Sequence, residues 1–266
     1  MSRVVVFFLL ICSAGSTGKE LELGAGVFSA SIPHYLGSSQ HSNYTLPLPY
    51  VVYRSDNLSV DRNSAVGYLW QYGPWHLDIS ATAAFAVDSQ DNTARKGMDD
   101  LDWVFELGPA LDYYIEGKPQ ADDFFKLGVF TRKALATDFS DINDLGFRFG
   151  PYLHWKKEVW QQDDSSVTLT SRAAVNFATS QYVNYFYGVV QSDVTATRSY
   201  YKGRSGYSGS ELSIGVSYDS NRWWLGGFVK YYRLKDSTWQ DSPLVERHHN
   251  IAIGAGVAWK FYRLAD

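Results

Sequence analysis

The stretch ELSIGVSYDSNRWWLGGFVKYYR, residues 211–233, decides the fold. Apolar residues alternate with small or polar ones from Leu212 to Tyr218, and the alternation resumes from Trp223 to Tyr231. A period of two indicates β-strands with one apolar face, and the turn residues between the two runs indicate a hairpin. So much aromatic surface on one face must be covered, either by a protein core or by lipid.

The same period of two continues through the chain after residue 19. We predict about twelve strands, with no linker-like region between them. Their predicted ranges are 20–30, 44–54, 57–61, 64–71, 75–87, 101–116, 123–135, 145–159, 166–178, 209–219, 222–233 and 249–261. Residues 19–266 are therefore predicted to form one all-β domain.

The composition excludes two classes of protein. The chain has 266 residues, of which 16% are aromatic and 20% are charged, and its formal net charge is −4. A mean hydropathy of −0.24 excludes a polytopic helical membrane protein. A pI near 5.9, without a run of Lys and Arg, gives no basic footprint for nucleic acid. We predict no cofactor and no metal site.

Residues 1–18 have the layout of a secretory signal peptide. Arg3 gives a positive start, Val4 to Ile11 form an apolar core, and small residues follow up to Gly18. The single cysteine, Cys12, lies in this segment, and Ile11 before it does not fit a lipoprotein signal. We therefore expect an exported mature chain without cysteine, whose stability does not depend on disulfides.

Two features favour lipid, rather than a protein core, as the cover of the apolar faces. Several predicted strands reach about 11 to 16 residues, which is enough to cross a bilayer at a tilt. Aromatic residues also lie near the ends of the apolar faces, as in the interfacial belts of membrane barrels. The predicted belt is Trp75, Trp103, Tyr113, Trp155, Tyr218, Trp223, Tyr231 and Trp259.

The connections between strands fall into two alternating sets. One set is short: 55–56, 72–74, 117–122, 160–165 and 220–221. The other is long, with 62–63 as its exception: 31–43, 62–63, 88–100, 136–144, 179–208 and 234–248. Short periplasmic turns and long extracellular loops are typical of outer-membrane barrels, whose closed sheets leave no edge in the hydrocarbon. We predict a transmembrane antiparallel up-and-down β-barrel.

Charged residues on the opposite faces are predicted to line the lumen. They are Glu22, Asp78, Glu106, Asp112, Glu116, Arg148, His154, Lys156, Arg172, Glu211 and Lys230. Both signs are present, so we expect ion pairs that fill a narrow interior, and the alternative is a selective pathway for small polar solutes. Lys126 and Arg132 lie on a strand whose two faces are poorly separated.

The loop at 179–208 is rich in aromatic and basic residues. It contains Tyr182, Tyr185, Tyr187, Arg198, Lys202 and Arg204. Such residues on a rim suit recognition of sugars, lipopolysaccharide or another protein. The alternative is that the loop folds over the mouth of the barrel and plugs it.

The sequence does not predict an enzyme. Gly203-Arg204-Ser205-Gly206 approaches the G-x-S-x-G pattern without matching it, and Asp241 and His248 lie in a later loop. The carboxylate pairs Asp99-Asp100, Asp122-Asp123 and Asp163-Asp164 are predicted to be solvated residues of turns and loops, with bridging of a divalent cation or lipopolysaccharide as the alternative.

Stretches along the whole mature chain resemble one known family. They are LGAGVFSASIPHYLGSSQHSNYTLPLPYVVYR (23–54), QYVNYFYGV (181–189), LSIGVSYDSNRWWLGGFVKYYRL (212–234) and DSPLVERHHNIAIGAGVAWKF (241–261). The chain resembles the MltA-interacting protein (MipA/OmpV) family of Gram-negative outer-membrane proteins. Members of that family tend to end on the aromatic residue of the last strand, whereas here five residues follow Phe261.

The resemblance implies an outer-membrane protein that contacts lipid and lipopolysaccharide. It also implies a scaffold that joins a murein transglycosylase to a murein synthase, with a narrow porin or a surface adhesin or antigen as alternatives among relatives. The short predicted periplasmic turns offer little docking surface, so the scaffold hypothesis depends on the resemblance alone.

Overall fold

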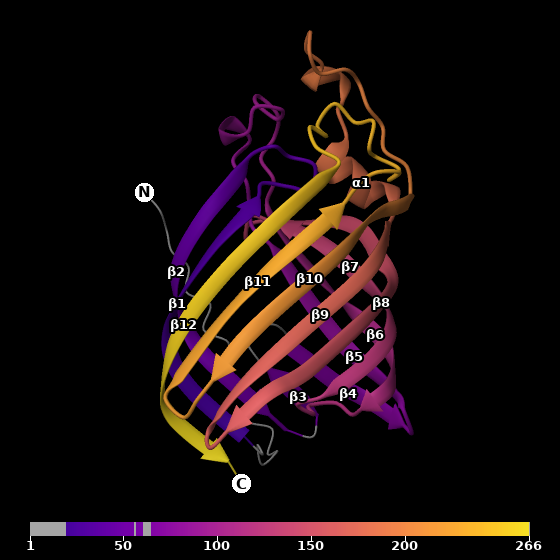
Figure 1. Cartoon of the computed structure of the whole chain (residues 1–266). Helices are drawn as coiled ribbons and strands as arrows, with labels where there is room; N and C mark the ends of the chain where they lie inside the picture. The colour runs from indigo at the N-terminus through magenta and orange to yellow at the C-terminus, as the bar shows by residue number, and fades with distance from the viewer. Residues whose placement is uncertain (1–19, 56, 61–64, 266) are drawn as a thin grey trace.

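The computed structural model describes residues 20–55, 57–60 and 65–265. Within these ranges twelve strands pair antiparallel, each with its neighbours in sequence, and β1 pairs with β12 to close a barrel (Figure 1). The predicted up-and-down barrel is therefore confirmed. The predicted signal peptide, residues 1–18, lies outside the described residues. No helix in the described part of the chain is long and apolar enough to span a bilayer.

The twelve predicted strands all exist, and they differ from the predicted ranges mainly at their ends. Their bounds are β1 Glu20–Pro33, β2 His41–Arg54, β3 Leu58–Val60, β4 Ala65–Tyr72, β5 Trp75–Ala84, β6 Trp103–Gly117, β7 Phe124–Thr137, β8 Ile142–Gln162, β9 Ser165–Ala178, β10 Gly206–Asp219, β11 Trp223–Arg233 and β12 His249–Ala265. One helix, α1 (Ser180–Tyr187), and two short 3₁₀ turns, Ser89–Asp91 and Gln191–Asp193, lie in the loops.

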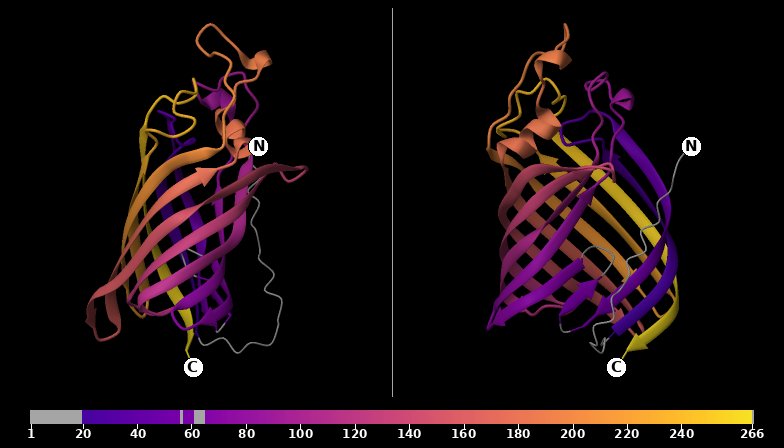
Figure 2. Two further views of the ribbon diagram at one scale, coloured as in Figure 1. Left: turned by 90° about the vertical axis from the view of Figure 1, so that its right-hand side faces the viewer. Right: turned by 180° about the vertical axis from the view of Figure 1, so that it is seen from behind.

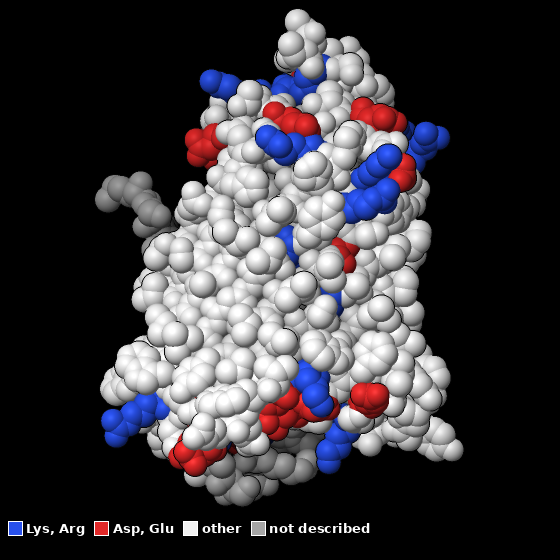
Figure 3. Space-filling view, in the orientation of Figure 1, with Lys and Arg blue, Asp and Glu red and all other residues white. Residues whose placement is uncertain are grey.

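Along most of the wall, side chains alternate between a buried inner face and an exposed outer face. In β6, Val104, Glu106 and Asp112 are buried, whereas Leu107 and Ile115 are 57% and 47% exposed. Exposed apolar side chains on every second position are what a lipid-facing wall requires. On the face that Figure 3 shows, Lys, Arg, Asp and Glu gather towards the two ends of the barrel, with few of them in the broad band between.

The two rims of the barrel differ as the sequence predicts. Short turns at 73–74, 118–123, 163–164 and 220–222 form one rim, where β1 also begins and β12 ends. Loops at 34–40, 85–102, 179–205 and 234–248 form the other rim (Figure 1). We call these the turn rim and the loop rim. By the rule for outer-membrane barrels, the turn rim faces the periplasm.

The last strand does not end at Phe261. β12 continues to Ala265, which is in register with Glu20 of β1. Arg263 contacts the carboxylates of Glu20 at 3.8 Å and Glu22 at 3.4 Å. The residues after Phe261 therefore extend the seam between the first and last strands.

The wall of the barrel is uneven. β8 has 21 residues, whereas β3 has three. β3 pairs with β2 at Tyr53 and Arg54, and β4 pairs with β5 as far as Ser80. The ring is thus closed by a short hairpin near the turn rim, between two much longer strands.

Candidate functional site

A network of charged side chains occupies the lumen on the side of the loop rim. The guanidinium of Arg148 in β8 contacts Glu106 Oε1 of β6 at 3.4 Å and Glu211 Oε2 of β10 at 3.5 Å. Arg172 of β9 contacts the other oxygen of Glu211 at 2.5 Å. Because both carboxylates are buried, these pairs join β6 to β10 through the interior of the barrel.

Two further cations approach the same carboxylates. Arg132 of β7 lies 3.9 Å from Glu106 Oε2, and Lys230 of β11 lies 3.9 Å from Glu211 Oε2. We call these six residues the loop-side network. Its four cationic and two anionic groups give it a formal excess of two positive charges, so its electrostatic potential favours an anion.

A second cluster lies nearer the turn rim. Lys126 Nζ of β7 contacts Asp112 Oδ2 of β6 at 2.5 Å, and the Tyr152 hydroxyl donates a hydrogen bond to the other oxygen of Asp112. Asp78 of β5 is only 2% exposed, and neither of its carboxylate oxygens accepts a hydrogen bond from a described residue. The ammonium group of Lys126 therefore pairs with Asp112, and Asp78 is buried without an ion pair to a described residue.

Aromatic rings separate these two clusters. Phe130 of β7 and Tyr152 of β8 pack against each other with ring centroids 6.2 Å apart. The Arg132 guanidinium lies 4.4 Å from the Phe130 ring centre, and that of Arg172 lies 4.5 Å from the Tyr152 ring centre. Such cation–π contacts are favourable when the cation is desolvated. The rings therefore fill this part of the lumen.

A third cluster closes the opposite side of the lumen near the turn rim. Lys260 Nζ of β12 contacts Glu22 at 3.3 Å and Asp219 at 2.5 Å. The Tyr50 hydroxyl donates to Glu22 at 3.1 Å, and its ring packs against Trp224 with centroids 6.1 Å apart. We call these residues the floor cluster.

The structure brings most of the predicted lumen residues into these clusters. Glu106, Arg148, Arg172, Glu211 and Lys230 meet in the loop-side network, Asp78 and Asp112 lie together, and Glu22 lies apart from them in the floor cluster. Two others lie nearer the turn rim. The His154 ring packs edge-on against Phe124, and Lys156 Nζ donates to the Ala121 carbonyl oxygen at 3.2 Å.

The prediction that Glu116 lines the lumen is wrong. The register between β6 and β7 shifts between Tyr114 and Glu116, and Glu116 is then opposite Phe125. An extra residue in one strand moves the following side chain to the other face. Glu116 is consequently exposed near the turn rim.

Sequence reasoning did not assign Lys126, Arg132 or Lys260 to the site. All three are buried on inner faces and take part in ion pairs. In β7 the inner face also holds the apolar Phe130, so polarity alone did not separate the two faces. The apolar Leu127 and Val129, which alternate with these inner residues and are exposed, were the sequence signal for the outer face of β7.

The aromatic residues of the predicted belt point outward at the two rims. Trp75 opens β5 and is in register with Tyr113, with ring centroids 4.9 Å apart. Trp103 opens β6 at the loop rim, and Tyr231 lies close to the end of β11 at that rim. The other members lie near the turn rim: Trp155, Tyr218, Trp223 and Trp259. Their rings suit the interfaces between water and hydrocarbon.

The loops of the loop rim pack together over the mouth of the barrel and form a lid (Figure 2). The lid has its own apolar core, made by Tyr35, Val87, Leu101, Val183, Tyr187, Val189, Leu234, Trp239 and Leu244. The Tyr187 and Trp239 rings stack with centroids 3.8 Å apart. Two buried arginines join its segments: Arg95 donates to the Phe186 carbonyl at 3.1 Å, and Arg198 donates to the Ala94 carbonyl at 2.9 Å.

Helix α1 fixes this lid to the barrel. Its Tyr182, Tyr185 and Phe186 pack against inner-wall residues of β6, β7 and β8. The Tyr182 hydroxyl donates to Glu106 Oε1 at 3.1 Å, which ties the helix to the loop-side network. The Tyr185 oxygen accepts the Asp102 backbone N–H at 2.7 Å, and burial raises the pKa of Tyr185 to about 12.

These contacts correct part of the prediction for the loop at 179–208. Tyr187 and Arg198 are 3% and 7% exposed, and Tyr182 and Tyr185 face the barrel interior and the lid. Those four residues hold the plug in place and do not present a recognition surface. Lys202 and Arg204 are exposed on the lid.

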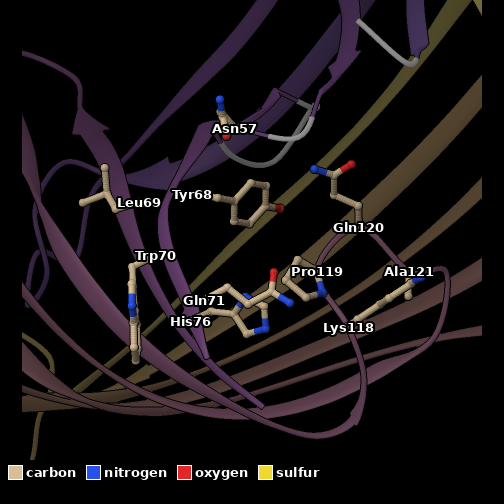
Figure 4. Close-up of a pocket in the computed structure, with 10 residues that line it drawn as sticks. All are labelled: Asn57, Tyr68, Leu69, Trp70, Gln71, His76, Lys118, Pro119, Gln120 and Ala121. Atoms are coloured by element: carbon tan, nitrogen blue, oxygen red, sulfur yellow. The ribbon is translucent and has the colours of Figure 1, made fainter. Parts of the chain in front are cut away.

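A pocket of ≈ 500 Å³ opens at the turn rim between β4 and the turn at 118–121 (Figure 4). Tyr68, Gln71 and His76 point towards that turn, whereas Leu69 and Trp70 lie on the other side of β4. The Gln120 side chain donates to the Ser55 carbonyl at 2.8 Å and holds the turn against the wall. The pocket thus offers amide and aromatic groups.

The described residues contain no group of three or more His, Cys, Asp or Glu placed to hold a metal.

A closed sheet with an apolar outer band, aromatic residues at both rims and a charged interior defines an outer-membrane β-barrel protein. The chain belongs to the family described as "MltA-interacting protein MipA", whose profile matches residues 23–261. It is therefore a protein of the outer membrane.

Two relatives support this placement. Outer membrane protein OmpV of Vibrio cholerae is 30% identical over 184 residues, which cover 66% of this chain and 62% of that protein. Outer membrane protein Omp26La of Vibrio anguillarum is 31% identical over 104 residues, covering 37% of this chain and 38% of that protein. The chain thus spans less than two thirds of either relative's length.

Among solved structures, a bacterial polysaccharide outer membrane secretin is 11% identical, with a TM-score of 0.43, over 91% of this chain and 98% of that one. The toluene transporter TodX of Pseudomonas putida is 9% identical, with a TM-score of 0.28, over 91% of this chain and 89% of that one.

Proposed function

We propose that this protein is a closed barrel that holds a murein transglycosylase at the periplasmic side of the outer membrane. The name of its family points to that partner. The observation that carries the proposal is the connection of the lid to the loop-side network through Tyr182 and Glu106. A lumen occupied in this way supports anchoring better than conduction.

Ions can pass along the lumen only after contacts inside the barrel break. An axial path on the β6–β10 side needs the ion pairs of Arg148 with Glu106 and Glu211 to separate, and a path on the β1–β2 side needs the lid to leave the mouth. Breaking a buried pair costs about 3–5 kcal/mol, because it leaves an uncompensated charge. Removing α1 from the mouth also exposes Val183 and Tyr187, which are 0% and 3% exposed. The closed state is therefore strongly favoured.

The pocket at the turn rim supplies the docking surface in this proposal. It faces the periplasm, where a murein enzyme works, and it combines amide groups with the Tyr68 ring. Lys118 lies exposed at its edge. A short segment of the partner fits a pocket of this size better than a broad surface does, which suits the small area of the turns.

The test combines cross-linking in native envelopes with two charge-reversal variants. We expect the wild-type chain to cross-link to a murein transglycosylase, Lys118→Glu to weaken that product, and Lys235→Glu in the exposed lid to leave it unchanged. Equal products from both variants would exclude the turn rim as the docking surface. No transglycosylase product from the wild-type chain would reject the scaffold itself.

A narrow porin is the second candidate, because the loop-side network lines the lumen with an excess of positive charge. Planar bilayers separate the two candidates. The scaffold gives no ion steps, whereas a porin gives anion-selective steps that change in Arg148→Gln. We assign no catalytic step to the chain: the Ser205 hydroxyl accepts the Ser180 backbone N–H at 2.8 Å, at the start of α1.

A further inference from the structure

The barrel wall has a lateral break between β2 and β5. In the described part of the chain, His41–Val52 of β2 pair with β1 alone, because β3 reaches β2 only at Tyr53 and Arg54. On the other side, β5 beyond Ser80 pairs with β6 alone. The ribbons of β2 and β5 lie apart above the short β3 (Figure 2, right). Stacked rings of Tyr44 and Phe85, 4.5 Å apart, bridge the two sides near the loop rim.

Side chains beside the break are exposed on both faces of the sheet. Residues 45–49 of β2 and 81–84 of β5 are all exposed, although inner and outer positions alternate in both segments. Pro47 and Pro49 lie in the unpaired part of β2. Proline lacks the N–H that hydrocarbon would leave unsatisfied, so it is found at strand edges. The edge of β2 is thus adapted to remain unpaired.

The inner surface next to the break is apolar. Leu46 and Leu48 are in register with Phe28 and Gly26 of β1, and they point into the barrel with exposed fractions of 37% and 46%. The Phe28 ring stacks on Phe228 with centroids 6.2 Å apart. The exposure of these inward leucines shows that side chains of the described residues leave space beside them in this half of the lumen. The apolar core of the lid lies above this space, and the floor cluster lies below it.

The other lip of the break leads directly to the loop-side network. Arg132 Nε donates to the Ser80 hydroxyl at 3.0 Å, at the position where β4 stops pairing with β5. The Thr82 hydroxyl, beyond that position, donates to Glu106 Oε2 at 3.3 Å. A molecule that enters through the break therefore meets an apolar surface on the β2 side. On the β5 side it meets a network with two excess positive charges.

We infer that the lumen takes a single-chain anionic lipid from the surrounding membrane through the break between β2 and β5. Its hydrocarbon chain lies along Leu46, Leu48 and Phe28, and its anionic headgroup lies at the loop-side network. The charge of the network selects the anionic head, and the outward apolar positions at the break, such as Pro47 and Ala81, open to lipid. This inference goes beyond the scaffold proposal and does not depend on it.

Photo-crosslinking tests the position of the lipid. The mature chain is reconstituted in phosphatidylcholine vesicles with palmitate that carries a diazirine at its chain end, and adducts are located by peptide mass spectrometry. We expect adducts on the inward Leu46 and Leu48. The outward Pro47, between them on the same strand, is the internal control for lipid that only surrounds the barrel. Adducts confined to Pro47 and other outward residues would overturn the inference.

Two pairs of variants test the route and the headgroup. Ala81→Trp fills the lip of the break, and we expect it to abolish the inward adducts, whereas Ala255→Trp, on the lipid face of β12, leaves them unchanged. Lys230→Gln removes one cation of the network, and a loss of about threefold is expected from a partly exposed charge contact. Lys133→Gln, whose ammonium pairs with Asp144 outside the lumen, is the control.

A neutral probe completes the test. Hexadecanol with the same diazirine has the same chain without the charge, and we expect it to give fewer inward adducts than palmitate. Equal inward labelling by the two probes would reject the role of the network, and inward labelling that survives Ala81→Trp would reject the lateral route.

Discussion

The wall from β6 to β10 and the wall from β2 to β5 enclose the lumen in different ways. The first uses long strands, with β8 spanning 21 residues, and fills the interior behind them with ion pairs and rings. The second closes the ring with a three-residue strand and leaves an apolar interior open behind prolines. Full pairing of the backbone is thus concentrated where the interior is charged, and the break occurs where the interior is apolar.

The largest expected effect lies in the filled wall. Lys126→Met leaves the buried Asp112 without its cation, and we expect the free energy of unfolding to fall by about 3–5 kcal/mol. Arg54→Met is the comparison at the thin wall, where the pair with Glu20 is more accessible and the expected loss is at most about 1 kcal/mol. Urea unfolding in detergent micelles measures both. Equal losses would remove the distinction between the two walls.

The next largest difference is expected between an arginine placed on the outer face of one wall and an arginine placed on the inner face of the other. Leu111→Arg puts a guanidinium into lipid near the middle of β6, beside the outward Leu77 and Val129, and we expect a loss of about 2–4 kcal/mol. Leu48→Arg, on the inner face beside the break, should cost less than about 1 kcal/mol, since Leu48 is 46% exposed and a long side chain there extends from the wall towards polar groups of the lumen. Refolding into phospholipid vesicles gives both values. A larger loss in Leu48→Arg would show that β2 faces the other way.

A methyl group tests how tightly each wall is filled. A Cβ at Gly128 would lie 2.2 Å from Asp112 Oδ1 and 2.5 Å from the Tyr152 ring, whereas a Cβ at Gly67 of β4 meets nothing within 4 Å. Gly128→Ala should therefore cost about 1–3 kcal/mol, because overpacking forces neighbours to shift. Gly67→Ala should be neutral or slightly stabilising. Thermal unfolding of the two variants provides the comparison.

The smallest effect concerns pH at the turn between β7 and β8, outside both walls. Hydrogen bonds from Asp141 and Ser140 lower the pKa of Asp138 to about 2. The carboxylate therefore stabilises the turn above its ordinary pKa near 3.8, and the contribution is lost as pH falls towards 2. Amide shifts of Ser140 and Asp141 should titrate with a midpoint near 2. Asp138→Asn should abolish that titration, and a midpoint near 4 in the wild type would contradict the geometry.

The barrel was predictable because its strands carry the alternation of apolar and polar residues that lipid imposes. Strands that cross hydrocarbon must also pair with one another in a closed sheet. The alternating short and long connections supplied the orientation. Only local irregularities misled the sequence argument. Glu116 follows a register shift, which no periodicity reveals, and Phe130 places an apolar ring on the inner face of β7.

The lid and the break could not be predicted in the same way. The stacking of Tyr187 on Trp239 joins loops that are far apart in the sequence, so only the closed barrel brings them together. Helix α1 has eight residues, which is too short to show a 3.6-residue period clearly. The break depends on how far β3 extends, and strand ends are the least certain part of any such prediction.

The seam between β1 and β12 determines how assembly must finish. The other strand pairs join consecutive strands, so each forms between nearby parts of the chain as a hairpin. The seam pairs Glu20 with Ala265 and closes a loop that contains all the remaining strands. Contacts of such long sequence separation form slowly, because the entropy of closing the loop must be lost first. The zipping of this last pair, held by Arg263 across Glu20 and Glu22, is therefore the expected final step of insertion.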